Sequence, residues 1–298
     1  MEKRIKMWTR AGMVAMVGAG SLHLAADAAP LPTAGAAMAP TGWAAGALLT
    51  LAAAHGASHG VAVAPGEAQA EGEGEGEGEG EGAAAADLAS DDAALLTQLG
   101  LMGGHLWIGH QLYREGQQAA AATHMKHPED ELYGGLRKAL VARGITPFDA
   151  ELSALANAVE HDQGRPAVAA AYANLTAAMA AAQRQVAASP HDTLRAAAAL
   201  LRTAGDEYGL AVDDAGKVIN AHEYQDAFGF VTLADTWVSG LNPGTDAALV
   251  AAVADLQRTI KQLYAAWPGV VPPDTVATRA WQLHGAASQA EITVQQSQ

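Results

Sequence analysis

Residues 90–113 read SDDAALLTQLGLMGGHLWIGHQLY, and this stretch decides the fold. Ser90 and the two aspartates after it are residue types that cap the start of a helix by accepting hydrogen bonds from its first N–H groups. Apolar side chains then recur at steps of three and four residues, the period of a helix with one buried face. They are Leu95, Leu96, Leu99, Met102, Leu106, Leu112 and Tyr113. The stretch predicts a long helix that ends near Ala122.

The rest of the chain repeats this pattern, with prolines, glycines and capping residues between apolar segments of helical period. No segment alternates convincingly with the two-residue period of a half-buried strand. Further helices are expected at 128–144, 146–161, 165–188, 190–209, 219–241, 245–267 and from residue 274 onward. Because the connections are short, sequential helices should be antiparallel neighbours. The sequence predicts an all-α fold, a bundle of seven or eight helices over residues 87–298, as one domain or as two halves, 87–163 and 164–298.

The first 86 residues do not resemble a globular domain. Residues 1–28 have a basic start, a weakly apolar run and the small-residue cleavage pattern Ala26-Asp27-Ala28, which indicate an export signal. A membrane anchor is the competing interpretation, but the run is short for a bilayer span. Residues 29–86 are rich in Ala, Gly and Pro and include a Glu-Gly repeat, so they predict a disordered linker. The protein is therefore expected in the periplasm or outside the cell.

Composition excludes several classes of protein. The chain has 298 residues, a net charge of −15 and no cysteine. Such an acidic chain is not expected to bind nucleic acid. Without cysteine there can be no disulfide, thiolate zinc site, iron–sulfur cluster or c-type haem, so a metal must be held by His, carboxylate, Tyr or Met. The His-Glu-x-x-His, phosphate-loop and Rossmann glycine patterns are absent, and no enzyme activity is predicted.

Residues 124–133, HMKHPEDELY, are the densest run of metal-binding side chains. On an ideal helix His124, His127 and Glu131 would lie within about 60° of one another. Pro128 interrupts that helix, so the two histidines are expected on a turn, with Glu131 one turn into the next helix. Nitrogen and carboxylate ligands suit Fe, Cu, Zn or Mn. The alternative is that His127 is only the N-cap of the next helix and that the acidic residues interact favourably with its dipole.

His105 is a further candidate ligand, because Gly103, Gly104 and Gly109 surround it in the predicted helix. Each glycine costs roughly 1 kcal/mol relative to alanine unless another backbone or a bound group must approach closely. His110 lies five residues later and points about 140° away, so one ion would rarely take both histidines. A core histidine bonded to a carbonyl group is the alternative for His105.

The stretch 222–226, HEYQD, is the second polar cluster. Glu223 and Asp226 are three residues apart, and His222 and Asp226 four apart, so these side chains can face one another on a helix. Glu223 and Asp226 are therefore possible contributors to the metal site. A merely solvated helix face is the alternative.

A family resemblance supports iron. Residues 206–212, DEYGLAV, and 214–226, DAGKVINAHEYQD, resemble the periplasmic segment of bacterial high-affinity iron permeases, with its Tyr, Ala-Val, Gly-Lys-Val and Glu-Tyr-Gln-Glu pattern. The resemblance covers roughly residues 200–290. It implies a role in iron uptake and carries over only onto Glu223 and Tyr224. A more distant likeness, to imelysin-like periplasmic proteins, is architectural, since their His-x-x-Glu motif is missing.

These observations predict an exported helical protein that binds a transition metal, with iron favoured over copper or zinc, and that assists iron uptake. The ligands of first choice are His105, His124, His127 and Glu131, and the partner is an inner-membrane iron permease. Two other interpretations stay open. One is a metal-free helical module that docks on a membrane partner, and the other is a protein that binds haem noncovalently through His105 or His124.

Overall fold

The computed structural model describes residues 85–298, and regular structure in this part of the chain is helical, which confirms the all-α fold. Its α-helices are α1 (Ala85–Ser90), α2 (Asp92–Arg114), α3 (Gln118–His127), α4 (Tyr133–Ala142), α5 (Asp149–Glu160), α6 (Arg165–Val186), α7 (Pro190–Ala211), α8 (Ala221–Gly240), α9 (Ala247–Leu263) and α10 (Ala280–Gln296). A π-helical turn, η1 (Pro128–Leu132), follows α3, and a 3-10 turn, η2 (Tyr264–Ala266), follows α9. The expected signal and linker lie outside the described residues, except for Ala85 and Ala86.

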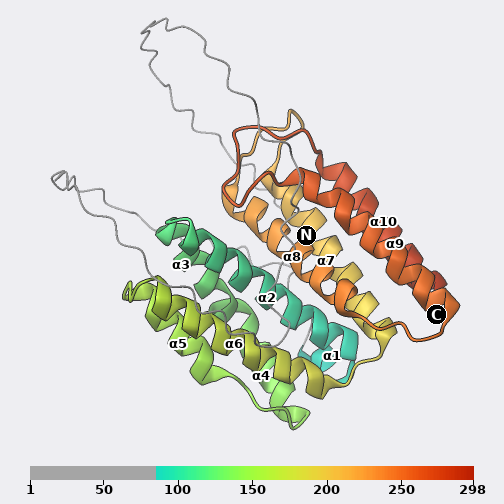
Figure 1. The fold of residues 1–298 in the computed structure, drawn as a ribbon, viewed down its shortest axis with the longest axis horizontal. Helices are drawn as coiled ribbons and strands as arrows, with labels where there is room; N and C mark the ends of the chain where they lie inside the picture. Colours follow the sequence, from blue (N-terminus) through green and yellow to red (C-terminus); the bar gives the residue numbers. More distant parts are fainter. Residues whose placement is uncertain (1–84) are drawn as a thin grey trace, which may run out of the picture. The chain divides into compact units, whose positions relative to one another are not determined.

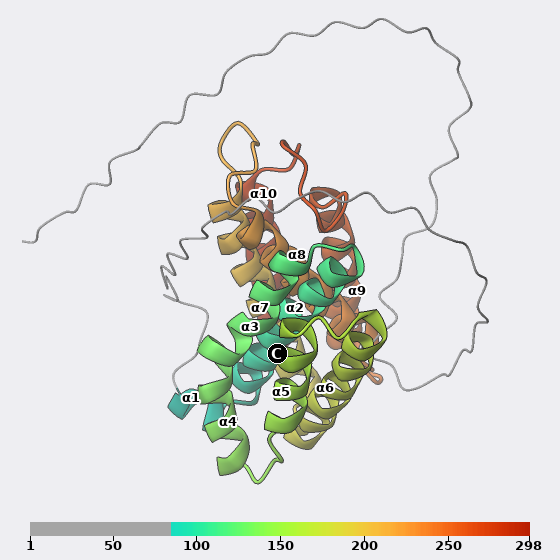
Figure 2. The same ribbon diagram turned by 90° about the vertical axis from the view of Figure 1, so that its left-hand side faces the viewer.

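Helix α2 is the central element, and it includes most of the stretch 90–113. Its N-cap is Asp91, whose carboxylate accepts hydrogen bonds from the N–H groups of Ala93 and Ala94 at 2.8 and 3.2 Å. It packs against α3 and α6 and also against α7 and α8, so most of its side chains are buried. Figures 1 and 2 show α2 along the junction between the N-terminal and C-terminal helices.

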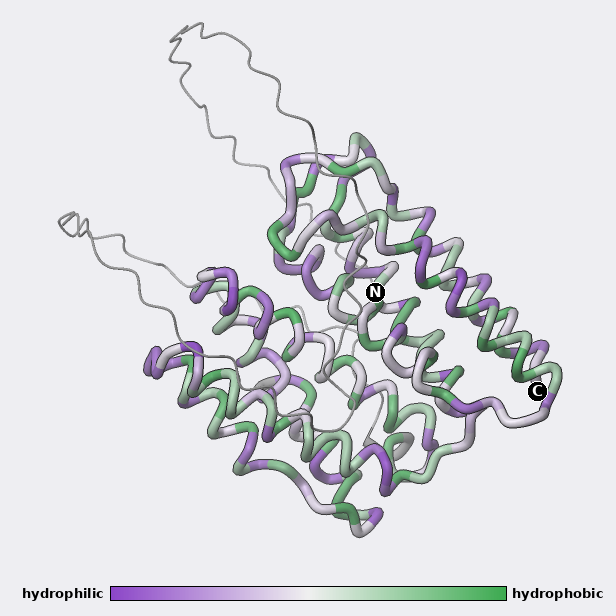
Figure 3. The backbone as a smooth tube through the Cα atoms, viewed as in Figure 1, coloured by the Kyte–Doolittle hydropathy of each residue, from purple (hydrophilic) through white to green (hydrophobic). Residues whose placement is uncertain are grey.

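The C-terminal helices form a four-helix arrangement, coloured yellow to red in Figure 1. In it α7 packs against α8 and α10, and α9 packs against the same two helices. The alternation of hydrophobic and hydrophilic residues along the tube in Figure 3 is the pattern of helices with one buried face. No helix within residues 85–298 is long and apolar enough to cross a membrane.

The expected first helix, to Ala122, was wrong at its end. Gly116 adopts a left-handed conformation, with φ of 82°, and the N–H of Gln117 donates to the Leu112 carbonyl at 2.9 Å. A glycine in this conformation is a common helix terminator because it has no side chain to clash. Helix α2 therefore ends at Arg114, and α3 folds back to pack against it.

The turn expected at Pro128 was also wrong. Helix α3 passes directly into η1 and α4, and the N–H of Tyr133 donates to the carbonyl of Pro128, five residues earlier. Proline removes one hydrogen bond and crowds the preceding turn, and a π-helical turn can absorb that interruption without ending the helical run. His127 and Glu131 consequently stay on one face.

The last helix begins at Ala280, later than the expected residue 274. The segment before it is extended and bonds to the α7–α8 loop. The N–H of Val218 donates to the backbone carbonyl of Asp274 at 3.0 Å, and the N–H of Val276 donates to that of Gly216 at 2.8 Å. These bonds replace the first turn of the expected helix. The other predicted helices lie close to the observed ones.

Candidate metal centre

The crossing of α2 and α8 sets the position of the site. A Cβ atom on Gly229 would lie 2.5 Å from the carbonyl oxygen of Gly104, and one on Gly104 would lie 2.5 Å from Cδ1 of Phe230. The two backbones therefore touch, which explains a glycine inside each helix. This contact brings His105, the residue after Gly104, beside Asp226 of α8.

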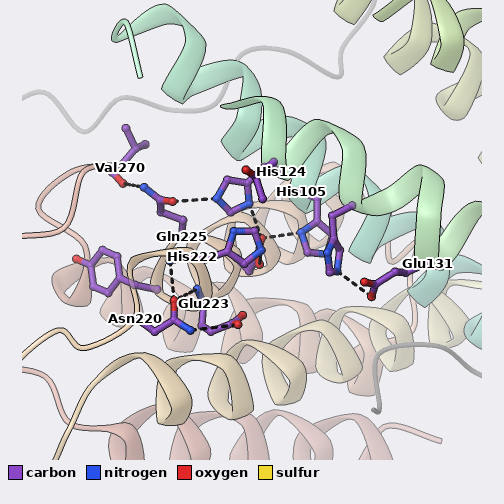
Figure 4. A network of polar contacts seen from close by, with 12 residues as sticks. His105, His124, Glu131, Asn220, His222, Glu223, Gln225 and Val270 are labelled. Carbon is purple, nitrogen blue, oxygen red and sulfur yellow. Dashed lines mark hydrogen bonds and ion pairs between the residues drawn. The ribbon is translucent and has the colours of Figure 1, made fainter. Parts of the chain in front are cut away.

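Helix α3 approaches α2 in the same way. A Cβ atom on Gly109 would lie 2.8 Å from Cγ of Met125 and 3.3 Å from Cβ of His124. The close approach turns His124 toward the same point as His105 (Figure 4). Residues from three helices thus converge at the junction of the N-terminal and C-terminal groups.

Asp226 is the centre of this convergence and is 1% exposed. Its Oδ1 lies 2.6 Å from Nδ1 of His105 and 2.9 Å from Nδ1 of His124, both fully buried. Its Oδ2 lies 3.1 Å from Nε2 of His222, which is 27% exposed. Each carboxylate oxygen therefore faces a different set of imidazoles.

The histidine rings are close to one another. His124 and His222 stack with centroids 4.1 Å apart and planes 11° from parallel. The ring of His127 lies 4.7 Å from that of His105 and 5.8 Å from that of His222. Four imidazoles share a small space, and all four could not be protonated there without strong repulsion.

Gln225 determines which nitrogen of His124 carries the proton. The Gln225 amide donates to the carbonyl oxygen of Val270 at 3.1 Å, so its oxygen faces Nε2 of His124 at 2.9 Å. That oxygen only accepts, so the hydrogen-bond network assigns an N–H to Nε2. In a neutral His124 the Nδ1 lone pair then faces the Asp226 carboxylate. Two acceptors at this distance require a cation beside them, either a proton on Nδ1 or a metal ion.

The electrostatic environment favours an ionised Asp226 and a neutral His222, which are the forms that bind metals. Burial by itself would raise the pKa of Asp226, but His105 and His124 hold that pKa below its usual range, so the carboxylate is ionised. Burial lowers the pKa of His222 to about 4, against the opposing effect of Asp226 and with help from the neighbouring histidines. His222 is therefore neutral at pH 7, the state in which imidazole binds metals.

The donor atoms fall into two groups of ligand spacing that share Asp226. One is His105, His124 and Asp226, and the other is His222, Glu223 and Asp226, each with its ligand atoms within 4.8 Å of one another. Adjacent ligands of an octahedral ion with bonds of about 2.1 Å lie about 3 Å apart. The distances from Asp226 to the imidazoles match that spacing, and imidazole with carboxylate suits iron, manganese, zinc or copper.

Comparison with known proteins finds a family match for the C-terminal helices. Residues 183–297 match the family model of the iron permease-associated 4-helix bundle domain. The match confirms the iron permease resemblance and extends it over α7 to α10. No curated protein and no solved structure matched the chain.

The residues that match this family model contribute only part of the centre. Asp226, His222, Glu223 and Gln225 lie within the match, whereas the histidines of α2 and α3 lie outside it. The centre is therefore assembled between the matched helices and the helices that precede them.

The expected ligands divide into two sets in the structure. His105, His124 and Asp226 meet directly, and Glu223 joins the second group. His127 and Glu131 lie beside the centre, where His127 Nε2 is 3.2 Å from Glu131 Oε2.

Sequence reasoning does not predict the places of His222 and Gln225 in this centre. The four-residue spacing of His222 to Asp226 is a signal that could have found it. The role of Gln225 had no local signal, because its partner Val270 lies in a distant loop.

Two cavities border residues of the centre. One, of about 350 Å³, is lined by His127, Glu131 and Glu160 among others. The second, of about 510 Å³, is lined by His222 and Gln225 together with Val271 and Pro272. Each cavity is thus lined by one of the two partly exposed imidazoles.

Proposed function

We propose that this protein binds a transition-metal ion, iron in particular, at the His105, His124 and Asp226 centre, and that it serves an iron permease as an exported accessory protein. The observation that carries the proposal is the chain of contacts from Val270 through Gln225 to His124. Metal-binding histidines commonly donate their other ring N–H to a fixed acceptor, which holds the ring and aims its lone pair at the metal. Here the lone pair is aimed beside a buried carboxylate.

A purely structural ion pair explains the centre less well. One protonated histidine would suffice to neutralise Asp226, yet three imidazoles contact it, and His222 is neutral at pH 7. Burying further imidazoles costs free energy unless their ring nitrogens find a partner such as a metal ion. A metal ion uses several neutral imidazoles and one carboxylate at once.

Iron and export are supported by other observations. The donor set accepts several first-row metals, and the family description favours iron and an iron permease as partner. Residues 1–28 support export to the periplasm. Haem binding has less support, because His105 and His124 are both fully buried and both direct Nδ1 at one carboxylate.

The test is metal binding by the full chain purified without a histidine tag and handled without oxygen. Iron(II) should bind and raise the melting temperature, and metal content should fall to background in Asp226→Asn and decrease in His124→Gln. His161→Gln is the control, because His161 is exposed at the end of α5 and bonds only to its own helix. Circular dichroism establishes that each variant is folded, and His105→Gln replaces any variant that is not. Absence of iron binding by the unaltered chain, or equal binding by the ligand variants, would refute the proposal.

A further inference from the structure

The two oxygens of Asp226 face two different donor groups, and we infer that this carboxylate bridges two metal ions. The inference rests on the proposed metal-binding function and specifies its stoichiometry. Oδ1 faces the two buried imidazoles of His105 and His124, and Oδ2 faces His222. We name these the inner site, made of His105, His124 and Asp226, and the outer site, made of His222, Glu223 and Asp226.

The stacking of two rings argues against one shared ion. An imidazole nitrogen directs its lone pair in the plane of the ring, so a bound ion lies close to that plane. The planes of His124 and His222 are 11° from parallel, with centroids 4.1 Å apart. Parallel, displaced planes do not meet at a common point near both nitrogens. Two ions, one in each plane, satisfy both rings, and carboxylate-bridged pairs are typically about 3.5–4 Å apart.

Charge supports an outer site that is weaker than the inner one. The outer site lies in the first turns of α8, where the helix dipole disfavours a cation. Glu223 supplies a second carboxylate to offset that effect, and its Oε1 is held by the Asn220 amide at 3.3 Å. The inner site combines two fully buried imidazoles with Asp226, far from solvent. The inner ion should therefore bind first.

The two sites also differ in how an ion can reach them from the cavity beside His222. His222 lines the cavity of about 510 Å³, whereas the inner ligands are buried behind it. An ion in this cavity therefore meets the outer site, through His222, before the inner one. The outer ion is thus the exchangeable one, and Asp226 connects it to the buried ion.

The experiment is anaerobic titration of the full chain with ⁵⁷Fe(II), followed by metal analysis and Mössbauer spectroscopy. Two ions per chain with two distinct iron signals are expected, and Glu223→Gln should lower the number to one while one signal stays. His222→Gln should do the same and replaces Glu223→Gln if that variant is unfolded by circular dichroism. Glu129→Gln, an exposed acid on η1, is the matched control and should keep two ions.

The outcomes separate the inference from the proposed function. One ion per chain in the unaltered protein would overturn the bridge and leave the metal-binding proposal standing. Two ions in the unaltered chain and also in both outer-site variants would overturn the assignment of the outer ligands. No bound iron in any form would overturn the proposed function itself.

Discussion

The Nδ1 atom of His124 lies 2.9 Å from Oδ1 of Asp226, while Gln225 holds the opposite nitrogen of the same ring. This relationship makes a buried glutamine responsible for the orientation of His124, one of the proposed metal ligands. It also ties the ligand to Val270, in the loop that precedes α10, because the Gln225 amide bonds to that carbonyl group.

Replacing Gln225 with leucine should weaken metal binding without removing a ligand. The variant frees the His124 ring and its proton position, and loss of such a supporting hydrogen bond typically lowers metal affinity by about 10–100-fold. Iron(II) affinity measured by competition with a chelator checks this, with Thr236→Val as a control in the same helix, since the Thr236 hydroxyl donates to the Thr232 carbonyl within α8. Unchanged affinity in Gln225→Leu would remove the main support for the proposed function.

Adding a methyl group at the glycine contact between α2 and α8 should destabilise the protein. Gly229→Ala places Cβ against the carbonyl of Gly104, a backbone atom that cannot rotate away, so the helices must separate. Overpacking of this kind costs about 1–3 kcal/mol. We expect Gly229→Ala to lower the free energy of unfolding by that amount in urea titrations and to weaken iron binding as well.

Gly134→Ala is the matched control for that change. Gly134 lies in α4, and a Cβ atom there would meet nothing within 4 Å. Its replacement should stabilise the protein by about 0.5–1 kcal/mol through helix propensity. Equal effects of the two substitutions would contradict the role of the Gly104 and Gly229 contact.

Local signals explain how much of the fold could be predicted from sequence. Asp91, Ser189 and Asp246 are helix N-caps in the structure, and each is a residue type whose short side chain accepts from the first N–H groups. The errors at Gly116 and Pro128 arose because each residue permits more than one backbone path. Which path is taken depends on the packing of α3 against α2, which the local sequence does not encode.

The site was predicted less completely, for a related reason. His105 and Asp226 are 121 positions apart, and only the packing of α2 on α8 brings them together. Residue type and spacing identified most of the side chains that meet at this centre, since His and carboxylate side chains are scarce in apolar helices. The assignment of Asp226 as the shared centre required the three-dimensional contact.

Protonation of His110 should reduce stability in mild acid. Burial lowers its pKa to about 4, with a further contribution from Arg114, whereas an unfolded chain has the ordinary value of about 6.5. A lowered histidine pKa means that the neutral side chain stabilises the fold above pH 6.5 and that this stability is lost as the pH falls towards 4. His110→Phe should keep the stacking on Tyr172, whose ring centroid is 4.1 Å away, and remove the titration.

Melting temperatures at pH 7 and pH 5 test this expectation. The decrease between the two values should be smaller in His110→Phe than in the unaltered chain. His161→Phe removes an exposed histidine and serves as the control for the loss of one titrating group. Parallel decreases in all three proteins would show that His110 does not resist protonation in the folded state.

His127 should matter less than His105, although the sequence ranks them equally. The His105 Nδ1 atom lies 2.6 Å from Asp226, whereas His127 pairs with Glu131 at 3.2 Å and borders the smaller cavity. His105→Gln removes a ligand of the inner site and should abolish the inner ion. His127→Gln should keep the number of bound ions and lower affinity by no more than about 10–100-fold, the range for residues that surround the ligands. Metal content and chelator competition on both variants distinguish these roles, and loss of an ion in His127→Gln would make His127 a ligand.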